Sequence, residues 1–508
     1  MRIFFLLSLI FTAIFTSAHN DNTWSDTVAN VMYSKCTSCH HEGGIGGFSL
    51  VNYEEAYPFR FAIKFSVEEK RMPPWPANPD YREFAHQRVL SEKEIEVIVD
   101  WVEDGAPIGD ATAIPEPPTY DNEALIKNAD FVGQMEEYES TATNDDEYRC
   151  FVIPTNFNED KVVSGIEVIP SNAEIVHHVL LFQDDSGRPE QLDARDEGIG
   201  YAGFGGTGSN ASTLMAGWVP GNAPAFFPKG MGIMLKKGTS LVMQVHYPAG
   251  SKGQKDQTEV RLKFSKESNT REVKIAPILN HNQLNEGELF IPANTTKTFT
   301  QNFRLNTNYS LLSVLPHMHL IGESITVNAT KDGDTINVVD IPKWDFHWQG
   351  TYVFPKLLKA SAGYSLNVEA TYNNTDSNPN NPNDPPLDVE EGEATGDEMM
   401  LVYFYYTTYR VGDEDIDQTN LQDEILSTPE EIIANGWEFY PNPVKKGENI
   451  KIDGFNDGTQ VSLLNLNGQV LSKSTNQNLS TPQLVPSGIY LIRIESEHKT
   501  QMKKIVIY

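Results

Sequence analysis

Cysteine is scarce in this chain, which has three in 508 residues: Cys36, Cys39 and Cys150. So few thiols leave little room for disulfides, and packing must stabilise the fold. Long hydrophobic runs are absent beyond the N-terminus, so we expect no membrane span in the mature protein. Basic residues are outnumbered, with 39 Lys and Arg against 70 Asp and Glu and a formal net charge of −31. This balance disfavours nucleic acid and anionic membranes as partners.

The N-terminus has the pattern of a signal peptide. Arg2 precedes an apolar run from Ile3 to Phe15, and small residues end at Ala18. The run is too short to cross a bilayer, so residues 1–18 are predicted to direct export and to be removed. A length of 508 residues far exceeds one hydrophobic core, so several domains are expected.

Two of the three cysteines belong to the motif Cys36-Thr37-Ser38-Cys39-His40. In the C-x-x-C-H arrangement two thiols attach haem covalently and the histidine becomes an axial iron ligand. A disulfide within the motif or half of a zinc site are the alternatives, but no second cysteine pair exists to complete a zinc site. The sequence therefore predicts a covalently bound haem c, and leaves Cys150 as a buried structural thiol.

The residues around this motif predict a small helical domain over 22–110. Ser91 and Glu94 form a capping box before a helix, and Gly105 follows its end. Between the motif and this helix, the prolines of KRMPPWPANPD exclude a regular helix and place Met72 on a loop. The domain resembles cytochrome c, which implies Met72 as the sixth iron ligand, with His86 as the alternative. His41 is expected to be solvated.

Six further residues have side chains that suit copper: His177, His178, His246, His317, His319 and Met399. Neutral imidazole binds copper well, and a thioether favours the cuprous state, whereas zinc has no redox chemistry. Side chains two apart on a strand share a face, so His317 and His319 are expected to chelate one ion with Met318 turned away. His177 and His178 are adjacent, so binding one ion together requires a bulge or a strand end.

Each of these residues alone also has an ordinary interpretation. His246 ends an alternating segment whose polar face, with Gln244, could line a site or simply be half-buried. Met399 stands beside Met400 and could fill a core. The occurrence of all six in one order favours a shared role.

Together these residues resemble the copper type II, ascorbate-dependent monooxygenases, over roughly residues 125 to 412. The resemblance implies two all-β jelly-roll sandwich domains, over 124–270 and 271–412, and two copper ions. By the resemblance His177, His178 and His246 hold the electron-delivering copper, and His317, His319 and Met399 hold the copper that binds dioxygen. Gln244 and Tyr403 match positions near the sites, with Tyr403 in the catalytic set, and His347 is expected to be structural. Leu315 stands where peptide-amidating members carry an arginine, so a glycine-extended peptide substrate is not supported.

The last residues, 437–508, form a separate small β-sandwich in this interpretation, after a linker over 413–436. Alternating segments, an Asn467-Gly468 turn and the sequence YPNPV resemble the C-terminal sorting domain of the type IX secretion system. The alternative is a structural or carbohydrate-binding sandwich. The resemblance implies contact with the secretion machinery and release from, or attachment to, the surface of a Bacteroidetes-type bacterium.

The sequence thus predicts a multidomain secreted monooxygenase, with a small all-α domain followed by three β domains. It would hydroxylate a C–H bond of an unidentified small molecule or peptide with dioxygen. The expected reductant is ascorbate or a redox protein, and the haem at His40 is expected to pass electrons to the copper at His177, His178 and His246. A non-catalytic haem and copper electron-transfer protein, or a copper-binding protein, is the alternative.

Overall fold

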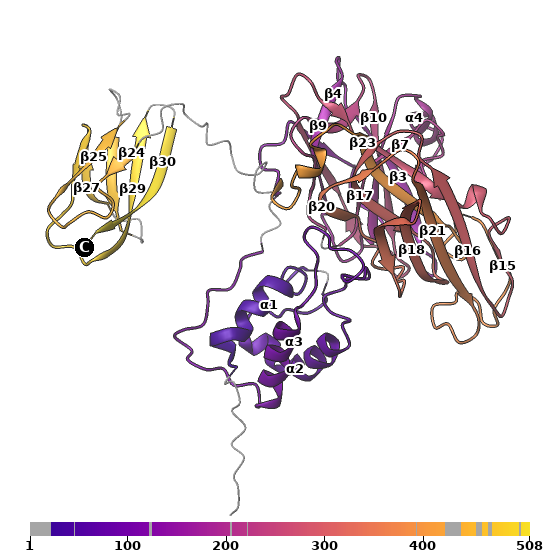
Figure 1. Cartoon of the computed structure of the whole chain (residues 1–508), viewed down its shortest axis with the longest axis horizontal. Helices are drawn as coiled ribbons and strands as arrows, with labels where there is room; N and C mark the ends of the chain where they lie inside the picture. Colours follow the sequence, from indigo (N-terminus) through magenta and orange to yellow (C-terminus); the bar gives the residue numbers. More distant parts are fainter. Residues whose placement is uncertain are drawn as a thin grey trace, which may run out of the picture. The chain divides into compact units, whose positions relative to one another are not determined.

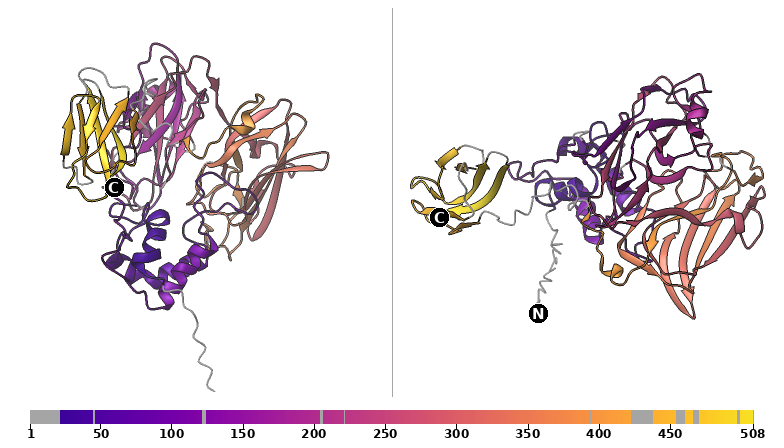
Figure 2. Two further views of the ribbon diagram at one scale, coloured as in Figure 1. Left: turned by 60° about the vertical axis from the view of Figure 1, so that its left-hand side comes forward. Right: turned by 90° about the horizontal axis from the view of Figure 1, so that it is seen from above.

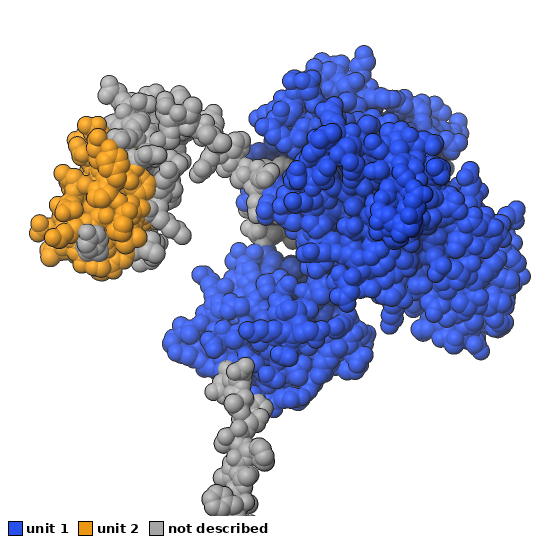
Figure 3. Space-filling view, in the orientation of Figure 1, with its two compact units in different colours: residues 1–426 blue, residues 427–508 orange. Residues whose placement is uncertain are grey.

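The structure is a computed structural model that describes residues 22–44, 46–120, 124–203, 206–220, 222–392, 394–421, 438–453, 460–465, 470–496 and 499–507. The chain divides into two compact units, residues 1–426 and 427–508, and each is described by itself (Figure 3). Strands predominate over helices, as expected for a multidomain β-rich protein. The predicted signal peptide and the Asn467-Gly468 turn lie outside the described residues.

The described chain begins with a small helical part, drawn in indigo and purple in Figure 1. It consists of the π-helical turn η1 (Trp24–Val28) and the helices α1 (Ala29–Lys35), α2 (Tyr53–Glu68) and α3 (Glu92–Glu103). Trp24, Ile98 and Trp101 are fully buried at its centre. The predicted capping box of Ser91 and Glu94 is present at the start of α3. Gly105, with φ +85°, lies in the left-handed region just after the helix.

A first pair of sheets follows, and its strands lie in the orders β1-β12-β4-β9-β13, with β8 beside β4, and β6-β3-β10-β5-β7. The elements are β1 (Phe131–Gln134), β2 (Tyr138–Glu139), β3 (Glu147–Pro154), β4 (Lys161–Ile169), β5 (His178–Asp184), α4 (Arg188–Asp193), β6 (Tyr201–Ala202), β7 (Thr213–Trp218), β8 (Ala225–Phe226), β9 (Met231–Leu235), β10 (Ser240–Tyr247), β11 (Lys255–Asp256), β12 (Glu259–Phe264) and β13 (Arg271–Glu272). Leu241, Met243 and Val245 of β10 point into the shared core, as alternation predicts.

A second pair of sheets has the strand orders β14-β23-β17-β20 and β16-β21-β18-β19. Its elements are β14 (Lys274–Asn280), η2 (His281–Gln283), β15 (Phe290–Ile291), β16 (Thr295–Arg304), β17 (Tyr309–His317), β18 (Gly322–Lys331), β19 (Asp334–Ile341), β20 (Tyr352–Ala360), β21 (Ser365–Asn374), β22 (Val389–Glu390), β23 (Leu401–Thr408) and η3 (Asp413–Asp415). In both views of Figure 2 the magenta and the orange strands form separate stacks. Leu312, Leu357 and Tyr405 of the second pair join the core of the first, so the two stacks pack together.

The segment after β23 remains attached to both pairs of sheets. Asp413 is buried and receives two hydrogen bonds from the Arg271 guanidinium, at 2.7 and 2.8 Å. The buried Gln418 side chain donates to the carbonyls of Leu312 and Phe354. Residues 413–421 are therefore part of the packed unit rather than of the linker in which the sequence placed them.

The loop between α2 and α3 leaves the helical part and packs on the second pair of sheets. Trp75, Ala77 and Phe84 join the core of that pair. The backbone N–H of Asn78 donates to Asp340 O, and that of Ala85 to Val353 O, each at 2.8 Å. Residues 75–85 are called the docking segment below.

The C-terminal unit has two sheets, with strand orders β24-β25-β28 and β27-β26-β29-β30. The strands are β24 (Glu438–Tyr440), β25 (Asn449–Asp453), β26 (Gln460–Leu464), β27 (Val470–Ser474), β28 (Asn478–Ser480), β29 (Gly488–Ser496) and β30 (Lys499–Ile507). Ile450, Val461, Leu463 and Ile492 lie in its own buried core. A separate small β unit is therefore confirmed.

Candidate functional site

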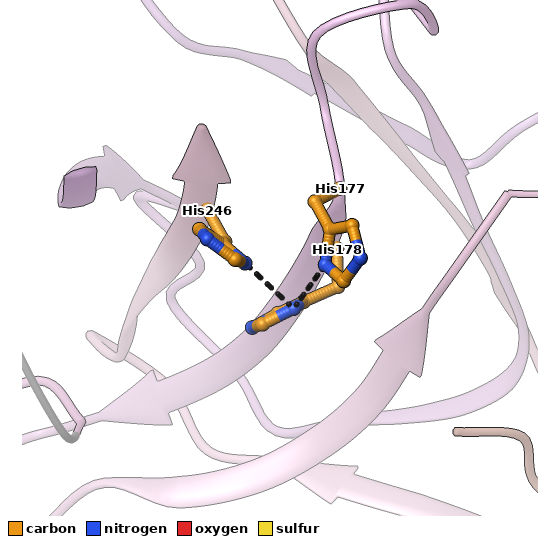
Figure 4. Close-up of side chains that lie close together, drawn as sticks. All are labelled: His177, His178 and His246. Carbon is orange, nitrogen blue, oxygen red and sulfur yellow. Dashed lines mark hydrogen bonds between the residues drawn. The ribbon is translucent and has the colours of Figure 1, made fainter. Parts of the chain in front are cut away.

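Three histidines come together where β5 begins and β10 approaches its end. His178 opens β5 and pairs in register with His246, and the N–H of His177 donates to His246 O at 2.9 Å. Nδ1 of His178 lies 3.4 Å from Nδ1 of His177 and 3.3 Å from Nδ1 of His246 (Figure 4). His177, His178 and His246 are called the histidine cluster, and their ligand atoms all lie within 4.8 Å of one another. The structure confirms that His177 and His178 lie at a strand end.

The surroundings of the histidine cluster favour neutral imidazoles. Burial, and then the proximity of His246 and His347, lowers the pKa of His177 to about 4. Burial also lowers the pKa of His178 well below its ordinary value. A neutral imidazole keeps a free lone pair, which is the form that binds metals. Three Nδ1 atoms that face one another cannot all be satisfied by shared protons, so the donor set fits a metal ion such as copper.

Two residues outside the cluster contact His246: Asp146, which directly precedes β3, and Tyr148, which lies in β3. Asp146 Oδ2 lies 3.1 Å from Nε2 of His246, a close approach that is not aligned as a full hydrogen bond. The contact with His246, together with the backbone N–H of Ala249, outweighs burial and lowers the pKa of Asp146. The Tyr148 ring stacks on His246 with centroids 4.3 Å apart and an interplanar angle of 9°. These contacts fix the ring and direct Nδ1 toward the cluster.

A second group, His317, His319 and Met399, is called the His–Met cluster. The two imidazole rings lie 5.1 Å apart. Nδ1 of His317 lies 2.5 Å from Gln349 Oε1, and Nδ1 of His319 lies 3.0 Å from Asp397 O. These contacts occupy both Nδ1 atoms and leave the Nε2 atoms as metal donors. Met399 lines the same cavity, and a donor set of two imidazoles and a thioether suits copper.

His317 and His319 were expected to share one face of a strand, but only His317 lies in the strand. β17 ends at His317, so His319 is not held on a strand face. Met318 is fully buried in the core, as expected, and is turned away from the cluster. The position of His319 depends instead on Glu398, whose side chain is fully buried.

Glu398 joins the two chain segments that carry the His–Met cluster. Its Oε2 accepts the N–H groups of His319 at 2.9 Å and Met399 at 3.2 Å, and its Oε1 accepts the N–H of Ile321 at 2.9 Å. Burial raises the pKa of the Glu398 carboxyl to about 8, against the lowering effect of these hydrogen bonds. Met400 N–H donates to Nδ1 of the buried His281 at 3.2 Å, which adds a second anchor next to Met399.

His177 and His178 of the histidine cluster and all three residues of the His–Met cluster line one cavity of about 300 Å³. The Phe346 ring stands between them, with its centroid 6.2 Å from that of His177 and 6.1 Å from that of His319. Leu315 and Tyr403 also line the cavity. His347, expected to be structural, is an exposed residue of the cavity wall with its ring 5.7 Å from that of His177.

Several residues of this site were not singled out from the sequence. Asp146, Tyr148, His281 and Phe346 lie in ordinary loop or strand contexts. Only the fold brings Tyr148, His281 and Phe346 to the cavity and Asp146 to His246. Glu398 precedes Met399 directly, and the full burial of its ionisable side chain is the feature that marks it. Gln244 was noted from the sequence, and its amide donates to the carbonyls of Gly203 and Gly206 and so shapes the cavity wall.

The C-x-x-C-H motif lies at the end of α1 and in the turns after it. Cys36 caps α1, and Cys36 and Cys39 are both free thiols and half-buried. Nδ1 of His40 lies 3.3 Å from Phe48 O, which leaves Nε2 for an iron ion. A Cβ at Gly46 would lie 2.3 Å from that ring, so only glycine allows this close approach. The arrangement fits thioether attachment of haem.

Large apolar side chains near the motif are exposed to solvent, and a bound haem could cover them. Phe48 and Phe59 stack with centroids 4.3 Å apart, yet they are 38% and 39% exposed. Met72, the expected sixth ligand, is 39% exposed, and the alternative His86 is exposed with φ +56°. His41 was expected to be solvated, but it is half-buried and stacks on Tyr120 at 4.3 Å.

Comparison with known proteins identifies the end of the chain. Residues 438–508 match the family described as "Secretion system C-terminal sorting domain". This match indicates export, followed by secretion or attachment to the outer surface, as in Bacteroidetes. No curated protein matches the chain. The part of the chain that the structure describes contains no helix that is long and apolar enough to cross a membrane.

Solved structures show only faint likenesses. A β-D-glucuronidase from Dictyoglomus thermophilum shares 13% identity over 47% of this chain and 44% of its own, with a TM-score of 0.13. PNGase F, a glycosylasparaginase from Flavobacterium meningosepticum, shares 9% identity over 54% of this chain and 96% of its own, with a TM-score of 0.24. The chain thus spans less than half the length of the glucuronidase. At these scores neither likeness bears on the fold or the activity.

Proposed function

We propose that this exported protein is a copper-dependent monooxygenase that hydroxylates a C–H bond with dioxygen and carries a c-type haem as electron donor or relay. The observation that carries the proposal is a single cavity lined by the His–Met cluster and by His177 and His178, which contact His246 behind them. In this proposal the two pairs of sheets are jelly-roll domains and the helical part is a cytochrome c domain. The sorting domain brings the enzyme to the type IX secretion machinery.

The donors of the two clusters support copper in particular. Three imidazoles suit either oxidation state, whereas the thioether of Met399 favours the cuprous state. Copper held by these donors supplies one-electron redox chemistry and the activation of dioxygen. The chain contributes the orientation of the donors, through Asp146 at His246 and Gln349 at His317. Burial keeps the imidazoles neutral and ready to bind.

The cavity wall supports an apolar substrate group. Leu315, Phe346 and Leu401 line it together with Tyr403. An aliphatic side chain at position 315 cannot hold a substrate carboxylate as a guanidinium would. We therefore propose a substrate whose reacting C–H bond lies in an apolar group, and not a peptide that is held by its C-terminus.

The decisive measurement is oxygen uptake by the copper-loaded protein with a reductant and a panel of small substrates. We expect uptake that depends on substrate, and loss of that uptake in Met399→Ile with the haem spectrum unchanged. Met400→Ile is the matched control, because it alters the neighbouring core methionine and should keep uptake. Reductant-dependent but substrate-independent uptake would instead support the electron-transfer or copper-binding alternatives.

Haem attachment has its own test. Thioether bonds consume Cys36 and Cys39, so the denatured protein should show one reactive thiol, that of Cys150. The same protein produced without haem should show three, because the described chain contains three free cysteines. Three reactive thiols in protein from a haem-maturing host would contradict the haem assignment.

A further inference from the structure

The docking segment lies between the two candidate sixth ligands of the haem. Met72 stands three residues before Trp75, and His86 directly follows Ala85. Three residues span at most about 11 Å of chain. Whichever of the two residues would serve as sixth ligand, it lies within three residues of the docking segment, which is packed against the second pair of sheets.

Aromatic side chains connect the docking segment with that pair of sheets. The Trp75 ring meets Tyr352 edge-on, with centroids 5.2 Å apart, and Phe84 lies 5.2 Å from the same tyrosine. Tyr352 is 2% exposed and opens β20, where it pairs with Val314 of β17. The contact thus reaches the strand that ends in His317.

The chain just before Tyr352 leads to the His–Met cluster. Thr351 and Gln349 line the cavity, and Gln349 contacts Nδ1 of His317 at 2.5 Å. Tyr352 is therefore connected with His317 through the backbone from Tyr352 to Gln349 and then through one hydrogen bond. Tyr352 is also the aromatic residue that Trp75 contacts. The route is short and is closed to solvent at Tyr352.

Trp75 also has a polar group that lacks a partner. Its indole Nε1 is buried and makes no hydrogen bond within the part of the chain that the structure describes. The Arg88 guanidinium lies 5.9 Å from the centre of the Trp75 ring. An unpartnered donor beside a guanidinium suits an anionic acceptor, and a carboxylate such as that of haem would satisfy both groups.

We propose that the docking segment is the entry path for electrons from the haem to the His–Met cluster, through Trp75, Tyr352, Gln349 and His317. This inference rests on the proposed function, because it requires haem at His40 and copper at His317, His319 and Met399. It differs from the sequence-based expectation, in which the histidine cluster received the electrons. In each transfer one ferrous haem becomes ferric and one cupric ion becomes cuprous, with no atom exchanged.

The test is anaerobic stopped-flow oxidation of the reduced haem by the protein's own cupric copper. Haem absorbance gives the rate, and the electron paramagnetic resonance of remaining cupric copper identifies the site that was reduced. His246→Ala removes the first copper and should keep haem oxidation. His317→Ala removes the second copper and should abolish it. Oxidation at the wild-type rate in His317→Ala, with its loss in His246→Ala, would overturn the inference.

Variants of the path give a second and independent measurement. Trp75→Leu should slow haem oxidation while both copper signals and the haem band keep their wild-type intensity. Trp75→Phe keeps an aromatic ring against Tyr352 and should restore much of the rate. Equal rates in all three proteins would overturn the assigned path. A wild-type protein that binds no haem or no copper would instead overturn the proposed function, so the two failures are distinguishable.

Discussion

Glu398 accepts a hydrogen bond from the backbone N–H of His319 at 2.9 Å, and this contact joins the end of β17 to the segment that carries Met399. The same carboxylate accepts the N–H of Met399 at 3.2 Å. Two of the three donors in the His–Met cluster are thus positioned by one buried side chain. Neither His319 nor Met399 can shift without disturbing its backbone hydrogen bond to Glu398.

The first prediction concerns Glu398→Gln. An amide at this position directs an NH₂ group at backbone N–H groups, so at least one buried donor loses its acceptor, at about 1–3 kcal/mol. We expect copper content to fall from two ions toward one, with the haem band and the histidine cluster unchanged. Elemental analysis and electron paramagnetic resonance would show this. Glu390→Gln changes an exposed residue on β22 and serves as the control; full copper content in Glu398→Gln would contradict the positioning role.

The second prediction concerns Asp146→Asn. Asp146 lies beside Nε2 of His246, so it favours the tautomer with the proton on Nε2 and the lone pair on Nδ1. Loss of such a partner typically lowers metal affinity by about 10- to 100-fold. A competition titration with a copper chelator would measure it. Asp145→Asn, at the exposed neighbouring position, should leave affinity unchanged, and equal affinities in both variants would contradict the prediction.

Part of the histidine cluster could be predicted from the sequence because its signals lie within short segments. His177 and His178 are adjacent, so the need for a strand end followed from strand geometry, and alternation placed Gln244 and His246 on one face. The pairing of His178 with His246 is a contact between distant segments, and the sequence predicts it only through the family resemblance. Asp146 was not predicted from the sequence, because its partner His246 lies 100 positions away along the chain.

The docking segment shows what local patterns cannot provide. Its prolines correctly predicted an irregular loop, and α3 with its capping box was predicted from the sequence. No local signal indicated that Trp75 and Phe84 pack into the core of a distant pair of sheets. Such packing depends on the shape of a surface formed by residues almost 270 positions further along, including Tyr352.

The third prediction is a pH dependence. The folded pKa of His177 is about 4, below the ordinary value of 6.5. A lowered pKa means that the unfolded state binds more protons, so this contribution to stability is full above pH 6.5 and is lost as pH falls toward 4. The metal-free protein should therefore melt at lower temperature across this range. Differential scanning calorimetry would follow the loss.

Copper binding should follow the same protonation. Copper requires neutral imidazoles, so the rise in melting temperature on adding copper should be large at neutral pH and should shrink toward pH 4. His177→Gln provides the comparison, since it removes one of the titrating rings and should weaken the pH dependence of the metal-free protein, to which His178 also contributes. An undiminished pH dependence in this variant would assign the effect to other groups.

The fourth prediction concerns the ion pair of Arg271 and Asp413, whose side chains are only 11% and 5% exposed. Burial alone would raise the pKa of the Asp413 carboxyl. Its hydrogen bonds with Arg271 and Ser310 have the opposite effect and outweigh burial, so the pKa lies below its ordinary value of 3.8. This contribution is thus present above pH 3.8 and is lost as pH falls through the folded pKa. Asp413→Asn leaves a buried guanidinium unpaired, which costs roughly 3–5 kcal/mol of unfolding free energy.

Denaturant unfolding at neutral pH would measure this loss, followed by the fluorescence of tryptophans in the sheets. Asp415→Asn removes an equal charge from an exposed position in the same turn, and it should leave the midpoint unchanged. The variant Asp413→Asn should also lose part of the acid sensitivity of the wild type, because its own side chain no longer titrates. If Asp413→Asn destabilised the protein no more than Asp415→Asn does, the ion pair of Arg271 and Asp413 would contribute nothing beyond surface charge. Packing alone would then hold β13 to the second pair of sheets.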